Sequence, residues 1–117
     1  MKIHQGTVQH LHISGFEDLN PIRVMWEDNA PCGRVTITCY GAAWTGYWSD
    51  MRADLRNFFI GSRPEFIRVN LLRNSAPRPA SYRREEEVHL ERVIVAVQAA
   101  FKNSLRSERA QPLEVAA

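Results

Sequence analysis

The sequence predicts an α+β fold in which a small antiparallel β-meander is followed by two short helices and a long C-terminal amphipathic helix. Apolar and polar residues alternate in the first half of the chain, as they do in half-buried strands. In the second half, apolar residues recur at three- and four-residue steps, which is typical of helices. The length of 117 residues is that of one domain. We expect residues 1–106 to form this single domain and residues 107–117 to be a flexible C-terminal tail.

Three runs in the first half predict strands. Residues 10–13 and 22–26 alternate in polarity, and a stretch dense in turn-forming residues follows the second run. The clearest run spans residues 34–40, where Val35, Ile37 and Cys39 point to one face and the residues between them to the other. Because the connections are short, consecutive strands are expected to pair as an antiparallel meander.

Residues 41–48 fit two structures. As a helix they would add Trp44, Tyr47 and Trp48 to the apolar stripe of the segment that follows, whereas as a strand they would place Trp44 and Trp48 on one face. Two glycines and a threonine among the aromatic residues favour the strand. Three large aromatic side chains in five residues are not all expected in the core, and we expect Trp48 at the surface.

Two short helices are expected next. The first begins at Met51 and ends at Gly61, with Arg52 and Arg56 off its apolar face. The four residues 62–65, Ser-Arg-Pro-Glu, have the form of a capping box with proline near the first turn. This cap predicts a second helix from residue 63 to about 72, although Ile67, Val69 and Leu71 alternate with polar residues as in a strand.

The strongest helical signal lies between residues 82 and 105, after a proline-containing connector at 74–80. Acidic residues occupy its first turns and basic residues its end, as the helix dipole favours. Its apolar stripe would pack either within the chain or across a homodimer, and the pattern does not decide between these. The stripe consists of Leu90, Val93, Ile94, Val97, Ala100, Phe101 and Leu105.

Thirteen of the fifteen basic residues are arginine, and eight of these lie between residues 51 and 84 against two acidic residues. Arg52 and Arg56 are expected one turn apart on a helix face, with Arg63 and Arg68 beyond them. One interpretation is a nucleic-acid-binding face that contacts phosphates, helped by stacking on nearby aromatic rings. The other is a face of ion pairs with the glutamates of the last helix, and the modest net charge of +2 favours it.

The sequence contains no motif of a catalytic or metal site. His10 and His12 lie on one side of a strand, but a catalytic metal normally has three protein ligands and no third is indicated. Three consecutive glutamates, Glu85, Glu86 and Glu87, point in different directions around a helix, so they do not converge on one centre. We therefore expect no catalytic residues, no enzyme activity, no metal and no cofactor.

Two cysteines, Cys32 and Cys39, are too few for a disulfide framework and are expected to be free thiols. No apolar run is long enough to span a membrane, and the N-terminal residues contain no apolar stretch of a signal peptide. We expect a protein of the cytoplasm of its host cell that has no membrane partner.

Several segments between residues 18 and 102 are distinctive, above all the Trp-x-x-Tyr-Trp element of Trp44, Tyr47 and Trp48. The others are residues 18–24, 33–41, 57–59 and the helical pattern of 90–100. Together they resemble a family of small, uncharacterised bacteriophage and prophage proteins. The sequence differs from that pattern after Trp48, where Ser-Asp-Met-Arg replaces a glycine-flanked methionine. The resemblance implies a phage accessory protein of the bacterial cytoplasm and carries no catalytic residue over to this chain.

Our functional hypothesis is a non-enzymatic accessory protein that binds a host or phage protein, with inhibition of a host defence or recombination complex as one candidate action. Exposed aromatic residues beside an arginine-rich helix face would form its contact surface. The residues assigned to this partner-binding surface are Trp44, Tyr47, Trp48, Arg52 and Arg56. The alternative is a nucleic-acid-binding module that uses Arg52, Arg56, Arg63 and Arg68.

Overall fold

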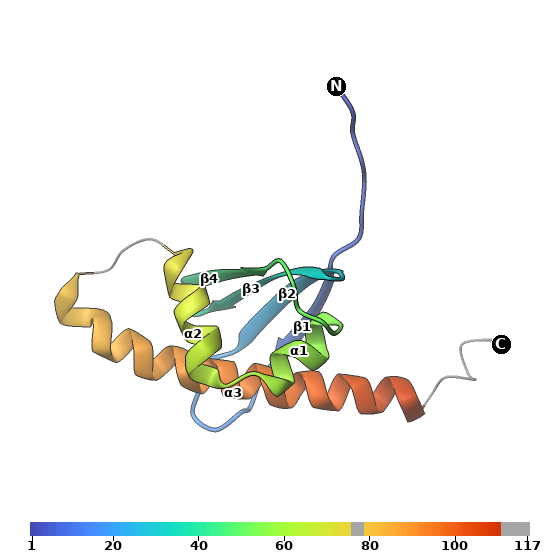
Figure 1. Cartoon of the computed structure of the whole chain (residues 1–117). Coiled ribbons are helices and arrows are strands. Elements are labelled where there is room, and N and C mark those ends of the chain that lie inside the picture. Colours follow the sequence, from blue (N-terminus) through green and yellow to red (C-terminus); the bar gives the residue numbers. More distant parts are fainter. Residues whose placement is uncertain (76–78, 111–117) are drawn as a thin grey trace.

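The structure, a computed structural model, describes residues 1–75 and 79–110. Four strands come first in this part of the chain, and three helices follow (Figure 1). The elements are β1 (Gln9–Ile13), β2 (Ile22–Asn29), β3 (Cys32–Cys39), β4 (Ala42–Trp48), α1 (Leu55–Gly61), α2 (Pro64–Arg73) and α3 (Ala80–Ala110). The predicted α+β class is confirmed, with its meander, two short helices and long last helix.

The sheet has the strand order β1-β2-β3-β4 with every neighbouring pair antiparallel. The segment that fitted both a strand and a helix is a strand: β4 pairs with β3 along its length, and Tyr47 lies opposite Arg34. Tyr40 and Gly41 join the two strands, and both have positive φ angles. A two-residue loop with two positive φ angles is the hairpin connection whose twist matches that of the strands.

All three helices lie on the same side of the sheet (Figure 1). Helices α1 and α2 pack on α3, and α2 also contacts β4. Alternate residues of β2, β3 and β4 point toward the helices and are buried, as the alternation of strand side chains requires. The sheet's buried apolar side chains are Ile22, Val24, Trp26, Val35, Ile37, Cys39, Trp44 and Trp48.

Helix α3 supplies more buried residues to the core than either α1 or α2. The ring of Phe101 lies 5.1 Å from that of Trp26 and 5.3 Å from that of Phe59, so strand, short helix and long helix meet at one aromatic cluster. The apolar stripe of α3 therefore packs within the chain. The fully buried residues of α3 are Leu90, Val93, Ile94, Ala96, Val97 and Phe101, all but Ala96 being members of the predicted stripe. The helix continues to Ala110, four residues beyond the domain boundary expected at residue 106, and the rest of the expected tail lies outside the described residues.

The expectation that Trp48 lies at the surface is wrong. Trp48 is 7% exposed and packs against the rings of Phe58 and Phe59, whereas Tyr47 is 46% exposed. The reason is the two-residue period of a strand: once Trp44 faces the helices, Trp48 faces them too, and Tyr47 must point to the opposite face.

Helix α1 begins at Leu55 rather than at Met51. The backbone N–H of Met51 donates to the carbonyl of Pro31 at 2.8 Å, which holds this buried residue in a loop whose neighbouring residues are exposed. Arg52, which follows it, has a φ angle of 58° and so lies outside a right-handed helix. The first N–H of α1, that of Leu55, donates to a carboxylate oxygen of Asp28 in β2 at 3.0 Å. A contact distant in sequence thus caps the helix.

The second helix is confirmed, but its predicted capping box is not formed. The residue that precedes α2 is Arg63, and no side chain accepts a hydrogen bond there. Ser62, the expected cap, instead donates its hydroxyl to the carbonyl of Phe58 at 2.8 Å, at the end of α1. Pro64 at the first helical position, whose fixed φ suits a helix start, remains the local signal for α2. Ile67 and Leu71, one turn apart, are its buried residues.

Within residues 1–75 and 79–110, no helix combines the length and the apolar character that crossing a membrane requires.

Candidate functional site

The structure separates the five residues predicted to form a partner-binding surface. Trp44 is 2% exposed, and its indole N–H donates to a carboxylate oxygen of Glu86 in α3 at 3.3 Å. Because Trp44 and Trp48 are both core residues, neither indole ring is available to a partner. Tyr47 is the aromatic residue of this group that reaches the surface.

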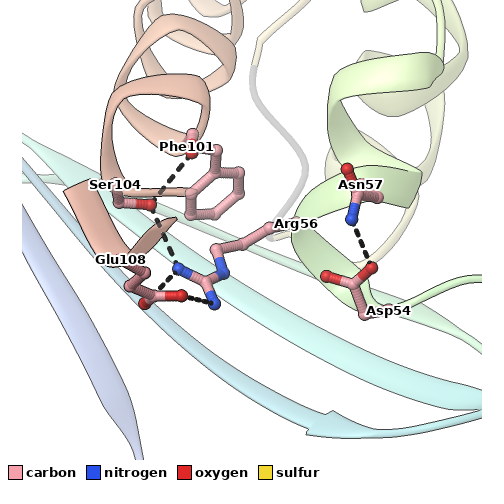
Figure 2. A network of polar contacts seen from close by, with 6 residues as sticks. All are labelled: Asp54, Arg56, Asn57, Phe101, Ser104 and Glu108. Atoms are coloured by element: carbon pink, nitrogen blue, oxygen red, sulfur yellow. Dashed lines mark hydrogen bonds and ion pairs between the residues drawn. The ribbon is translucent and has the colours of Figure 1, made fainter. Parts of the chain in front are cut away.

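Arg52 and Arg56 do not share a helix face, contrary to the sequence-based expectation. Arg52 lies in the loop before α1 and pairs with Asp50 at 3.5 Å, both side chains being exposed. Arg56 lies on α1 and is held in a network with the end of α3 (Figure 2). Its guanidinium donates to both carboxylate oxygens of Glu108, at 2.7 and 3.0 Å, and to the hydroxyl of Ser104 at 3.2 Å.

The Arg56 network is a structural contact between helices. The guanidinium also lies over the ring of Trp26, with 5.8 Å between its carbon and the ring centroid, and its side chain is 14% exposed. The hydrogen bond from Arg56 lowers the pKa of the Glu108 carboxyl below its ordinary value. Arg56 thus fastens α1 to the last turns of α3.

The helical arginine face expected for nucleic-acid binding is not formed either. Arg68 on α2 pairs with Glu91 on α3, and Arg56 pairs with Glu108. For these two arginines the interpretation as ion pairs with glutamates of the last helix is confirmed. Arg63 lies at the exposed start of α2, and Arg52 lies in a loop. The four arginines therefore do not line up as one phosphate-binding surface.

The face of the sheet away from the helices is open, because no helix in the described part of the chain packs on it (Figure 1). Tyr47 projects from this face, and the Arg34 guanidinium lies 5.8 Å from the centroid of its ring. The neighbouring thiol of Cys32 raises the pKa of Tyr47 above its ordinary value. We define the open face by the outward residues of the four strands, which are His10, His12, Arg23, Met25, Glu27, Asn29, Cys32, Arg34, Thr36, Thr38, Ala43, Thr45 and Tyr47.

The backbone of Tyr47 is fixed from the other side by α2. The carboxamide of Asn70 accepts from the N–H of Tyr47 and donates to its carbonyl, each at 3.1 Å. Asn70 thus occupies the backbone N–H and carbonyl of Tyr47 that a further strand would otherwise bind. At this point β4 is not available for pairing with another strand. Sequence reasoning missed both Asn70 and Arg34. The strand alternation carried a signal for Arg34, since it placed that residue on the face opposite Val35, but nothing local pointed to Asn70.

A hollow of about 280 Å³ lies in the open face beside Arg34, the residue whose guanidinium contacts the ring of Tyr47. Met25 and Val8 provide apolar surface in it, and Arg34 and Glu27 provide opposite charges at its rim. The residues that line it are Val8, Met25, Trp26, Glu27, Arg34 and Thr36. The open face thus combines an aromatic side chain, a cation and an apolar depression.

The two strand histidines lie on the open face, as expected. Their rings are 5.8 Å apart between centroids and nearly perpendicular, and the Arg23 guanidinium contacts Nε2 of His12 at 3.3 Å. Among the residues that the structure describes, no three histidine, cysteine or carboxylate side chains are grouped to hold a metal ion.

The sequence of the chain is similar to a family of known proteins but to no individual curated protein. No curated protein and no solved structure matches it significantly. One family model, described as a phage family, matches residues 1–79, which include the whole sheet, α1 and α2. The chain therefore belongs to a family of bacteriophage proteins.

Proposed function

We propose that this phage protein acts by binding a host or phage protein through the open face of its sheet, and that it is an accessory protein rather than an enzyme. The observation that carries the proposal is the exposed pair of Tyr47 and Arg34 beside the hollow. Tyrosine, arginine and methionine are enriched at the centres of protein interfaces. The open face presents all three, with Met25 in the hollow.

The rigidity of this face supports the same proposal. Tyr47 is fixed through its backbone by Asn70 and through its strand by β3, and Thr36 and Thr45 are hydrogen-bonded across the two strands at 3.3 Å. Binding to an already ordered strand face costs less conformational entropy than binding to a loop that must first become ordered. One candidate action of such a binding protein is the inhibition of a host defence or recombination complex.

Two single substitutions on the open face test the proposal. Tyr47→Ala and Arg34→Ala are expected to weaken binding about tenfold or more, which corresponds to the loss of about 1.4 kcal/mol or more at a central interface residue. The tagged protein is used to capture proteins from bacteria infected by a phage that encodes it, and captured proteins are identified by mass spectrometry. Binding of each captured candidate to purified protein is then measured by calorimetry.

Phe66→Ala is the matched control, because it removes an exposed aromatic ring from α2, on the helix side of the sheet. A specific partner is a protein that the wild type and Phe66→Ala retain equally and that both open-face variants lose. If every candidate binds the open-face variants as tightly as the wild type, the open face is not the interaction surface.

A further inference from the structure

Strand β1 forms an outer edge of the sheet, because β2 is its single neighbour in the strand order. Across residues 1–75 and 79–110, no hydrogen bond links the backbone of β1 to any element other than β2. A strand directs its N–H and C=O groups alternately to its two sides, so the groups of β1 that point away from β2 are free. Such a free edge is a template for pairing with another strand.

The free backbone groups of β1 are those of His10 and His12. At the other edge, the N–H and carbonyl of Tyr47 both bond to Asn70, so they point away from β3. In an antiparallel sheet this direction alternates from residue to residue, and two residues that lie opposite each other direct their groups either both toward or both away from one another. When this rule is followed through the registers of the three strand pairs, the groups of Leu11 point toward β2 and those of His10 and His12 point outward.

Strand β1 lacks the features by which edge strands avoid pairing. Its sequence, Gln-His-Leu-His-Ile, contains no lysine, proline or acidic residue, and its register with β2 runs through all five residues without a bulge. The opposite edge differs, because Asn70 occupies the N–H and carbonyl of Tyr47. A second copy of this chain therefore offers a free edge at β1 and a partly occupied edge at β4.

The side chains of β1 suit a second copy of the same strand. Leu11 and Ile13 lie half-buried against the core, whereas His10 and His12 lie on the open face. A strand placed beside β1 must therefore be apolar toward the helices and polar on the other face, and β1 has this pattern itself. It also carries no acidic, lysine or arginine side chain, so two copies meet without like-charge repulsion within the pair. Arg23, whose guanidinium contacts His12, belongs to β2 and lies one strand away from the edge.

We propose that two copies of this chain pair antiparallel through β1, about a two-fold axis at Leu11. In this register His10 of each copy lies opposite His12 of the other, and each such pair exchanges both of its N–H···O bonds. The axis is perpendicular to the sheet, so the helices of both copies lie on the same side and the two open faces join into one surface. This inference goes beyond the proposed function and does not depend on it.

Sedimentation equilibrium of the full chain tests the association. The weight-average mass is expected to rise from the 13.4 kDa of the monomer toward twice that value between about 10 µM and about 1 mM, because a contact of this size is at the weak end of protein interfaces. A mass that stays at the monomer value over this range, or that continues to rise past the dimer, overturns the proposal.

Amide hydrogen exchange of the wild type identifies the edge residue by residue. The N–H groups of Gln9, Leu11 and Ile13 point toward β2 and are expected to exchange slowly at every concentration. Those of His10 and His12 are expected to exchange fast in dilute protein and about tenfold more slowly when nine-tenths of the chains are paired. Slow exchange of these two amides in the monomer, or unchanged exchange in a dimeric sample, contradicts pairing through β1.

His12→Pro tests the backbone pairing directly. It removes the outward N–H, and proline is tolerated on edge strands where the N–H faces solvent, so the hydrogen bonds with β2 are retained. His12→Ala is the matched control, since it removes the same imidazole and keeps the N–H. We expect His12→Pro to remain monomeric at about 1 mM, the upper end of the range for a weak contact, and His12→Ala to associate like the wild type.

The dispersion of the amide spectrum checks that both variants fold. Equal association of His12→Pro and His12→Ala, whether retained or lost in both, overturns pairing through the backbone of β1. If His12→Pro does not fold, the exchange pattern of the wild type decides the question alone.

Discussion

Gly46 lies where β4 packs closely against α2. A Cβ atom at this position would be 2.9 Å from a ring carbon of Trp48 and 3.0 Å from both the carboxamide oxygen of Asn70 and a methyl carbon of Leu71. The Trp48 ring is held by Phe58 and Phe59, so it has little room to move away. We predict that Gly46→Ala lowers the free energy of unfolding by about 1–3 kcal/mol, the usual cost of overpacking a core. Urea unfolding measures this change.

Gly61→Ala is the control for that measurement. A Cβ atom at Gly61, the last residue of α1, would meet nothing within 4 Å, and its φ is not in the left-handed region. The free energy of unfolding of the Gly61→Ala protein is expected to stay unchanged or to rise by up to about 1 kcal/mol, because alanine restricts the conformations of the unfolded chain. A Gly46→Ala protein as stable as Gly61→Ala would show that β4 and α2 are not in close contact.

Two arginine–carboxylate contacts, Arg56 with Glu108 and Arg92 with Asp18, make a paired prediction about pKa values. Arg56 lowers the pKa of Glu108, and Arg92 lowers the pKa of Asp18, in both cases chiefly through a side-chain hydrogen bond. We predict that Arg56→Gln raises the pKa of Glu108 toward its ordinary value and leaves Asp18 unchanged, whereas Arg92→Gln does the reverse. Carboxyl carbon chemical shifts followed against pH measure both values.

The sign of the accompanying stability change follows from the direction of the shift. The pKa of each carboxyl is lower in the folded chain than in the unfolded chain, so each contact stabilises the fold above the unfolded pKa. That contribution is lost as the pH falls through the folded pKa. If Glu108 titrates alike in the wild type and in Arg56→Gln, the contact of Figure 2 is not made in solution.

The elements of this fold were predictable where one periodicity dominates. The alternation of Val35, Ile37 and Cys39 predicted β3, and the repeat of apolar residues from Leu90 to Phe101 predicted α3, because burial on one face imposes these patterns. The start of α1 was not predictable, since Met51 has helical spacing from Leu55 yet is held in a loop by Pro31. Its cap comes from β2, which no local pattern reveals.

The candidate site was predictable only in part, for a related reason. Strand alternation placed Tyr47 opposite to Trp44, but the sequence did not say which of the two faces the helices would cover. The predicted helical spacing grouped Arg52 with Arg56, whereas in the structure Arg56 pairs with Glu108 and Arg52 lies in a loop. Local patterns thus determine which residues share a face, and the packing of distant elements determines whether that face is exposed.

At the scale of the whole molecule, the family match and the core do not end at the same residue. The match covers residues 1–79, whereas α3 begins at Ala80 and contributes five large, fully buried side chains. Each such side chain stabilises a fold by about 1.5–3 kcal/mol, so together they contribute on the order of 10 kcal/mol, as much as a typical domain's entire stability. These side chains are Leu90, Val93, Ile94, Val97 and Phe101.

We therefore predict that a chain of residues 1–79 does not fold on its own, even though it contains the whole sheet, α1 and α2. Without α3, the rings of Trp26 and Phe59 would lose their contacts with Phe101 and be exposed to water. The amide NMR spectrum is expected to lack dispersion, and urea is expected to produce no cooperative transition. A chain of residues 1–110 keeps every contact described here and is expected to unfold cooperatively, like the full chain. A dispersed spectrum and a cooperative transition for residues 1–79 would instead show that the family's shared region carries a sufficient core without α3.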